Sequence, residues 1–114
     1  MRRVCVNVKN SHRYPYGGYA YLGVPKISNA PPGSVYLITL RLGGPERFPF
    51  TPPRRLGVPP LRLACWREAL VAVAAHEARH IHQYRRELKR SEVECERFEA
   101  TMIERFGRTE AAAA

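Results

Sequence analysis

Residues 69–80 read ALVAVAAHEARH, an apolar run that leads directly into two histidines and a glutamate. The run is apolar on every side of a helix, which is typical of a helix buried in a core. His76 and His80 are four residues apart, so they stand on nearly the same helix face. Polar side chains that emerge from a buried helix need partners, and a metal ion is one such partner. We therefore expect a buried helix that carries a metal site.

The pattern H-E-x-x-H suits a catalytic zinc ion. Such an ion takes three protein ligands and keeps one position open for water, and His76 and His80 would supply two of the ligands. Glu77 lies beside them and can serve as the general base that takes a proton from the zinc-bound water. Hydrolysis of an amide bond is the reaction that this favours. The alternative is an ordinary solvated helix face, because the motif fixes only three positions.

Length and composition indicate one soluble globular domain. The chain has 114 residues, of which 45% are hydrophobic and 25% charged. No apolar run is long enough for a membrane span, and the N-terminus does not read as a signal peptide, so we expect a cytoplasmic protein that does not contact a membrane. Cys5, Cys65 and Cys95 are odd in number and widely spaced, which favours reduced core thiols. We expect Cys95 to be a packing residue, with a place near the site as the alternative.

The net charge of +9 is compatible with an acidic partner such as nucleic acid. The basic residues are scattered along the chain, however, and only those between residues 85 and 90 form a cluster. That cluster suits the C-terminal end of a helix. Charge alone therefore favours an ordinary basic surface, with nucleic-acid binding as the alternative.

Three strands are expected before residue 43. Residues 3–9 alternate, residues 14–24 are rich in tyrosine and broken by Gly17-Gly18, and residues 34–42 are strongly β-forming. We expect them to form a small, mostly antiparallel sheet. The proline-rich loop, residues 43–60, contains six prolines, which exclude a helix interior or a central strand. It either roofs the active-site groove or is a plain connector.

Two helices should follow the loop. The first is expected to start near residues 61–63 and to run at least to Tyr84. The second should begin at Ser91, where Ser91 and Glu94 form a capping box, and should end at a Gly107 cap. We therefore predict one α+β domain over residues 1–107 and a flexible tail over residues 108–114, which carries no evident chemistry.

A third metal ligand is expected in the second helix. Glu92 and Glu96 are four residues apart, hence on one helix face. H-E-x-x-H followed by such a helix resembles the gluzincin metallopeptidases, and the small size is similar to the mini-gluzincins. The resemblance covers residues 76–100. It implies that His76 and His80 are zinc ligands, Glu77 is the general base and Glu92 is the third ligand.

The same resemblance places Glu96 where the family has an aspartate that orients a ligand histidine. It also implies a substrate that lies along an exposed edge strand, for which residues 35–42 are the candidate. Glutamate in place of aspartate lengthens the side chain by one methylene. The connection between the helices is short as well, so that Glu96 or Glu99 would be nearer the histidines than Glu92 if the first helix ran on to Lys89. We keep Glu92 on the expectation that this helix stops soon after Tyr84.

Taken together, the sequence predicts a zincin-like α+β protein that binds Zn²⁺ and hydrolyses a peptide or protein substrate. A non-catalytic basic interaction module, which keeps or has lost the metal, is the alternative from another class. A DNA-associated protease of the Spartan type would suit the charge. That type should have a third histidine beyond H-E-x-x-H, and His82 is too close to serve. The sequence does not indicate the oligomeric state.

Overall fold

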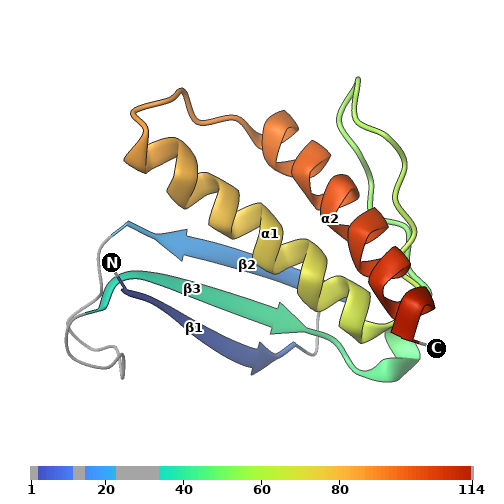
Figure 1. The fold of residues 1–114 in the computed structure, drawn as a ribbon. Coiled ribbons are helices and arrows are strands. Elements are labelled where there is room, and N and C mark those ends of the chain that lie inside the picture. The colour runs from blue at the N-terminus through green and yellow to red at the C-terminus, as the bar shows by residue number, and fades with distance from the viewer. Residues whose placement is uncertain (1–2, 12–14, 23–33, 114) are drawn as a thin grey trace.

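The computed structural model describes residues 3–11, 15–22 and 34–113. In this part of the chain the elements are β1 (Arg3–Asn10), β2 (Tyr16–Tyr21), β3 (Ser34–Leu42), the 3-10 helix η1 (Pro45–Arg47), α1 (Trp66–Arg85) and α2 (Glu92–Ala113). Helix α1 lies on one face of the sheet, against β2 and β3, and α2 packs against α1 (Figure 1). The predicted α+β class is confirmed.

The sheet is mixed rather than mostly antiparallel. Its strand order is β1-β3-β2, with β1 parallel and β2 antiparallel to the central strand β3. Because β3 is paired on both sides, the expectation that residues 35–42 offer an exposed edge to a substrate is wrong. The open edge next to α1 belongs to β2.

The core lies between β3 and the first half of α1. Alternate residues of β3, from Tyr36 to Leu42, turn the same face of the strand toward the helix and are buried. Small residues of α1, among them Ala69 and Ala72, meet them. The apolar run that precedes the histidines is therefore the part of α1 that anchors the helix to the sheet.

Helix α1 begins later than predicted. The backbones of Leu63 and Phe50 form an isolated antiparallel bridge, with both N···O distances at 2.8 Å, so the chain is still extended at residue 63. Strands β1 and β3 lie where the sequence predicts them. Strand β2 is shorter than expected at both ends, and residues 14, 23 and 24 of the expected strand lie outside the described residues.

Helix α1 ends at Arg85, soon after Tyr84. The expectation that Glu92 is the third ligand depends on this early end. The backbone N–H of Leu88 donates to the carbonyl of Gln83 at 2.8 Å, and Glu87 adopts a left-handed conformation with φ of 57°. This is the arrangement in which a helix usually ends on glycine. A glutamate therefore terminates α1, although no residue of the connection is a typical helix breaker.

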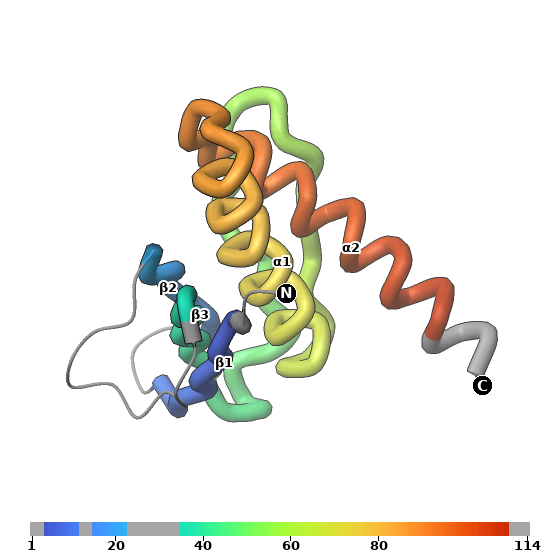
Figure 2. Tube along the Cα trace, turned by 60° about the vertical axis from the view of Figure 1, so that its left-hand side comes forward, coloured from blue at the N-terminus to red at the C-terminus, as the bar shows by residue number. Residues whose placement is uncertain are grey.

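Helix α2 begins as predicted but continues further. The backbone N–H of Glu94 donates to Ser91 Oγ at 3.1 Å, which completes one half of the capping box. The predicted cap at Gly107 is wrong, because α2 runs through it to Ala113. A single glycine costs a helix only about 1 kcal/mol, and the residues that follow are mostly good helix formers. This last part of α2 projects away from the rest of the fold (Figure 2).

The proline-rich loop is fastened to α2. Arg54 pairs with Glu99, Arg55 pairs with Glu96, and Arg97 donates to the carbonyl of Gly57. These contacts hold one side of the loop along the first turns of α2. Neither described helix combines the length and the apolarity that a membrane crossing requires.

Candidate metal centre

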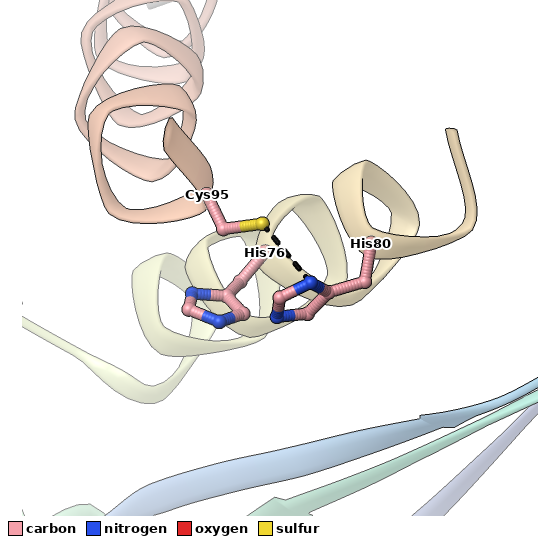
Figure 3. Close-up of side chains that lie close together, drawn as sticks. All are labelled: His76, His80 and Cys95. Carbon is pink, nitrogen blue, oxygen red and sulfur yellow. Dashed lines mark hydrogen bonds between the residues drawn. The ribbon is translucent and has the colours of Figure 1, made fainter. Parts of the chain in front are cut away.

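His76 and His80 lie side by side on α1, with ring centroids 5.0 Å apart (Figure 3). Cys95 reaches toward His80 from α2. One potential ligand atom from each of these three residues lies within 4.8 Å of the other two. The fold therefore brings together a His/His/Cys group that could hold a metal ion.

Glu92, in the first turn of α2, also faces both histidines. Its Oε2 lies 2.8 Å from His76 Nε2, and its Oε1 lies 2.9 Å from His80 Nε2. Arg90 approaches the same carboxylate at 3.3 Å. One carboxylate of α2 thus spans the Nε2 atoms of the two histidines.

The other nitrogen of His76 is held by Glu99. His76 Nδ1 lies 3.0 Å from Glu99 Oε2, and the same oxygen accepts a hydrogen bond from Arg54 Nη1 at 2.8 Å. Tyr16 donates a further hydrogen bond to this carboxylate. Glu99 is only 1% exposed, so it is a buried acceptor shared by β2, α1 and the proline-rich loop.

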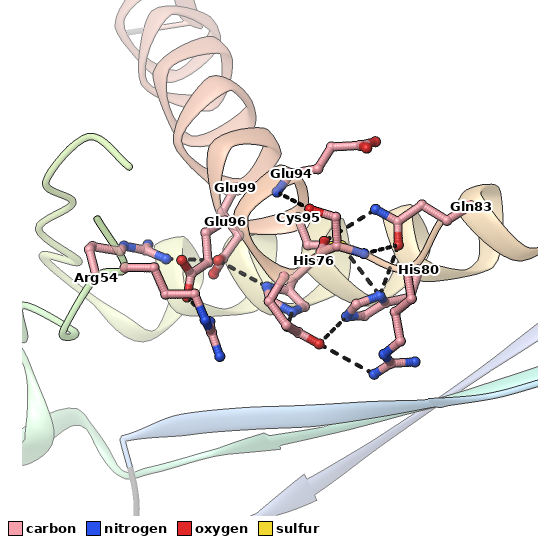
Figure 4. Close-up of polar contacts among 12 residues, drawn as sticks. Arg54, His76, His80, Gln83, Glu94, Cys95, Glu96 and Glu99 are labelled. Atoms are coloured by element: carbon pink, nitrogen blue, oxygen red, sulfur yellow. Dashed lines mark hydrogen bonds and ion pairs between the residues drawn. The ribbon is translucent and has the colours of Figure 1, made fainter. Parts of the chain in front are cut away.

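The corresponding nitrogen of His80 is held by Gln83 (Figure 4). The Ser91 N–H donates to Gln83 Oε1 and Gln83 Nε2 donates to the Ser91 carbonyl, both at 3.2 Å. These two bonds fix the amide orientation, so Oε1 must accept from His80 Nδ1–H, which lies 3.2 Å away. The neutral His80 ring therefore presents a lone pair at Nε2.

Cys95 contacts the same nitrogen of His80 as Gln83 does. Its Sγ is 3.4 Å from Nδ1, the nitrogen that already carries the proton for Gln83. Burial, together with the nearby charges of Glu92 and Glu94, raises the pKa of the Cys95 thiol to about 12. Zinc binds the thiolate, so a metal ion held by Cys95 would have to displace the proton of this thiol.

The electrostatics differ between the two histidines. Burial lowers the pKa of His80 and favours its neutral form. Burial alone would also lower the pKa of His76, but the hydrogen bond and charge of Glu99 outweigh it and raise the pKa. Burial opposes ionisation of Glu92, yet the two histidines and Arg90 lower its pKa overall. The expected state is an ionised Glu92 that faces a neutral His80.

Glu77 is buried and lies against β2. Its carboxylate accepts a hydrogen bond from the backbone N–H of Ala20, and burial raises its pKa. The close approach depends on Gly18, since a Cβ at that position would lie 2.7 Å from Val73 and 3.2 Å from the Glu77 side chain. Gly18 therefore lets α1 approach the open edge of the sheet.

The ladder register determines which backbone groups face that edge. Gly43 N–H donates to the Pro15 carbonyl at 2.8 Å, so the pairs in register with it, such as Gly17 with Arg41, are the hydrogen-bonded ones. Hydrogen-bonded and non-hydrogen-bonded pairs alternate in an antiparallel ladder. The backbone groups of Gly18 and Ala20 therefore point away from β3, toward the open edge beside Glu77.

A cavity of about 210 Å³ opens beside His76 and Glu77. Tyr16 and Gly18 of β2 line one side, and Pro53 and Arg54 of the proline-rich loop line another. Glu96 and Glu99 contribute from α2. The cavity joins the candidate metal centre to the edge of β2.

The sequence predicts five site residues, and the structure brings four of them together beside the candidate metal centre. These four are His76, Glu77, His80 and Glu92. Glu96 pairs instead with Arg55, and Glu99 takes the place beside His76 that the resemblance implied for Glu96. The sequence points to Glu99 only as an alternative to Glu92. Its position seven residues after Glu92, on the same helical stripe, is the signal that it faces the histidines. Nothing in the sequence singles out Arg54.

Comparison with known proteins gives no family for this chain. No family model, no curated protein and no solved structure matches it.

Proposed function

We propose that the protein is a zinc-dependent metallopeptidase in which His76, His80 and Glu92 hold the ion and Glu77 is the general base. The observation that carries the proposal is the contact between His80 Nε2 and Glu92 Oε1 at 2.9 Å. Either a proton on His80 Nε2 or a metal ion bound by both groups would make this contact favourable, and burial, which lowers the pKa of His80, disfavours the proton. The resemblance of H-E-x-x-H and the following glutamate helix to gluzincins supports the same ligand set.

The donor set fits zinc. With ligand distances of about 2.0–2.1 Å in tetrahedral geometry, neighbouring ligand atoms should lie about 3.3 Å apart. The Glu92 oxygens lie 2.8 and 2.9 Å from the two imidazoles, so a small rotation of Glu92 makes the space. A bound zinc ion would polarise a carbonyl group and lower the pKa of a water molecule.

Glu77 is suited to moving the proton. Its raised pKa makes the carboxylate a better acceptor for the proton of an attacking water, and it can then donate that proton to the leaving amine. The Ala20 N–H holds this carboxylate at the edge of β2. A peptide substrate that adds to this edge as an extended strand would place its scissile bond beside Glu77.

The first experiment measures zinc content in the purified protein and in matched variants. We expect one zinc per chain in the wild type, loss of zinc in His76→Ala and Glu92→Gln, and full zinc in Cys95→Ala. Zinc retained in Glu92→Gln and lost in Cys95→Ala would instead indicate the His/His/Cys group and favour a non-catalytic metal-binding protein.

The second experiment measures cleavage of casein and of a peptide library by zinc-loaded protein. Glu77→Gln should keep its zinc and lose cleavage by at least 100-fold, as expected when a general base is removed. Glu104→Gln is the control, because Glu104 is exposed and pairs with Arg108 in the later part of α2, outside the site. A zinc-loaded wild type that cleaves nothing would favour the basic interaction module, and salt-sensitive retention on DNA would point to nucleic acid.

A further inference from the structure

Arg54, in the proline-rich loop, is a buried arginine whose hydrogen bonds are incomplete among the described residues. Its side chain is 8% exposed, and Nη1 donates to Glu99 at 2.8 Å. Nε and Nη2 are also buried, and neither has a hydrogen-bond partner within the described residues. Burying a guanidinium with unpaired donors costs free energy. This cost points to a role for the hydrogen bond from Arg54 to Glu99.

That bond leads directly to the candidate metal centre. Arg54 and His76 contact the same oxygen of Glu99, at 2.8 and 3.0 Å. The position of this oxygen fixes the plane of the His76 ring and hence the direction of Nε2. Acceptors that hold a ligand histidine in this way typically change metal affinity 10–100-fold when removed.

We infer that Arg54 is a positioning residue: it anchors Glu99, which orients His76, so that docking of the proline-rich loop and metal binding are coupled. The inference rests on the proposed metal site but not on peptidase activity. If the docked loop strengthens metal binding, then by thermodynamic linkage bound metal must stabilise the docked loop by the same free energy.

Arg55 provides a matched control. It is the next residue in the same loop and also pairs with a glutamate of α2, Glu96. Glu99, and not Glu96, contacts the Nδ1 of His76. A variant at Arg55 therefore loses a loop-to-helix ion pair without releasing the acceptor that orients the histidine.

The test measures zinc affinity by chelator competition, with folding of the metal-free variants checked by circular dichroism. Arg54→Met should weaken zinc binding 10–100-fold and shift the visible spectrum of the cobalt-substituted protein. Arg55→Met should stay within about 2-fold of wild type, with an unchanged spectrum. A folded Arg54→Met protein with wild-type zinc affinity would overturn the inference, and a wild type that binds no zinc would overturn both this inference and the proposed function.

A comparison within a Glu99→Gln background keeps the test decisive if Arg54→Met alone does not fold, because that background leaves no buried Glu99 charge without its arginine. In a Glu99→Gln background, replacement of Arg54 by Met should have no further effect on zinc affinity, because the residue through which Arg54 acts has already been changed. Arg55→Met should have the same small effect in both backgrounds. A further loss of zinc affinity when Arg54→Met is added to Glu99→Gln would show that Arg54 does not act through Glu99.

Limited proteolysis measures the reverse direction of the coupling. Trypsin has to bind the Arg55 side chain, which pairs with Glu96 while the loop is docked. Leu56, the next residue, is 99% exposed, so the Arg55–Leu56 bond can be cleaved once the loop lifts from α2. Zinc should slow cleavage of this bond at least 5-fold in the wild type and should have no effect in Arg54→Met. Equal protection by zinc in both proteins would contradict the coupling.

Discussion

His76 and His80 each use Nδ1 for a protein partner and turn Nε2 toward Glu92. The partners differ, since Glu99 is an anionic acceptor and Gln83 a neutral one. Gln83 also joins the two helices, because its amide bonds both backbone groups of Ser91. The orientation of His80 therefore depends on how α2 starts.

Gln83→Leu tests this dependence. The change leaves the backbone groups of Ser91 and the Nδ1–H of His80 without their partner, so we expect a loss of stability of about 1–3 kcal/mol and zinc binding weaker by 10–100-fold. Chemical denaturation and chelator competition measure the two effects. Thr101→Ala is the control, because Thr101 is exposed and its hydroxyl donates to the Arg97 carbonyl on α2. It should change stability by no more than about 0.5 kcal/mol and leave zinc affinity unchanged.

Tyr16 provides a prediction that depends on pH. Burial, with the charge of Glu99, raises the pKa of its phenol from 10.0 to about 12. The phenol of Tyr16 has a higher pKa in the folded than in the unfolded protein. Its contribution to the free energy of unfolding is therefore fully present below pH 10 and is lost as the pH rises toward about 12. Denaturation of the metal-free protein should show this fall in stability, and Tyr16→Phe should remove that part of it. An identical pH dependence in both proteins would be evidence against the buried phenol.

The predictable part of the site is the part that lies on one periodic element. H-E-x-x-H on a helix brings His76 and His80 together by spacing alone, and Ser91 marks the start of the next helix. The choice of Glu99 rather than Glu96 beside His76 depends on how α2 is rotated and packed, which spacing does not determine. Arg54 comes from a loop without periodicity, so only the folded chain reveals its contact.

At the scale of elements, Gly18 controls how close α1 lies to β2. A Cβ on Gly18 would meet Val73 at 2.7 Å and the Thr39 carbonyl at 2.9 Å, whereas one on Gly17 would meet nothing within 4 Å. Gly18→Ala should therefore destabilise the fold by about 1–3 kcal/mol and lower cleavage, because Glu77 moves away from the edge. Gly17→Ala should be neutral within about 0.5 kcal/mol. Equal effects of the two substitutions would contradict the close approach.

The end of α1 gives a prediction in the stabilising direction. Glu87 has φ of 57°, a conformation that glycine adopts at lower cost, so Glu87→Gly should raise stability by about 0.5–1 kcal/mol. Arg86, with φ of −93°, is the control, and Arg86→Gly should bring no gain. Thermal unfolding compares the two. A loss of stability in Glu87→Gly would mean that the glutamate side chain, and not the backbone, ends the helix.

At the scale of the whole molecule, the sequence predicts the number and order of the elements but not how the strands are arranged. Alternation in residues 3–9 and 34–42 indicates two strands, yet nothing in either says that they pair in parallel. That pairing makes β3 central and leaves β2 as the edge beside α1, so the expected substrate strand moves from β3 to β2. Strand order depends on long-range packing, which local patterns do not contain.

The proposed ligands come from both helices, so metal binding should stabilise the molecule as a whole. A zinc concentration 1,000 times the dissociation constant would add about 4 kcal/mol to the free energy of unfolding. Removal of zinc by a chelator should accordingly lower the melting temperature of the wild type and leave that of His76→Ala unchanged. A chelator effect of equal size in both proteins would place the metal elsewhere.

X-ray absorption at the zinc edge of the purified protein tests the central claim most directly, because it distinguishes sulfur from nitrogen and oxygen ligands. The account predicts a first shell made only of nitrogen and oxygen at about 2.0–2.1 Å, from His76, His80, Glu92 and a water molecule. A sulfur scatterer at about 2.3 Å would contradict it, since Cys95 would then hold the ion in place of Glu92.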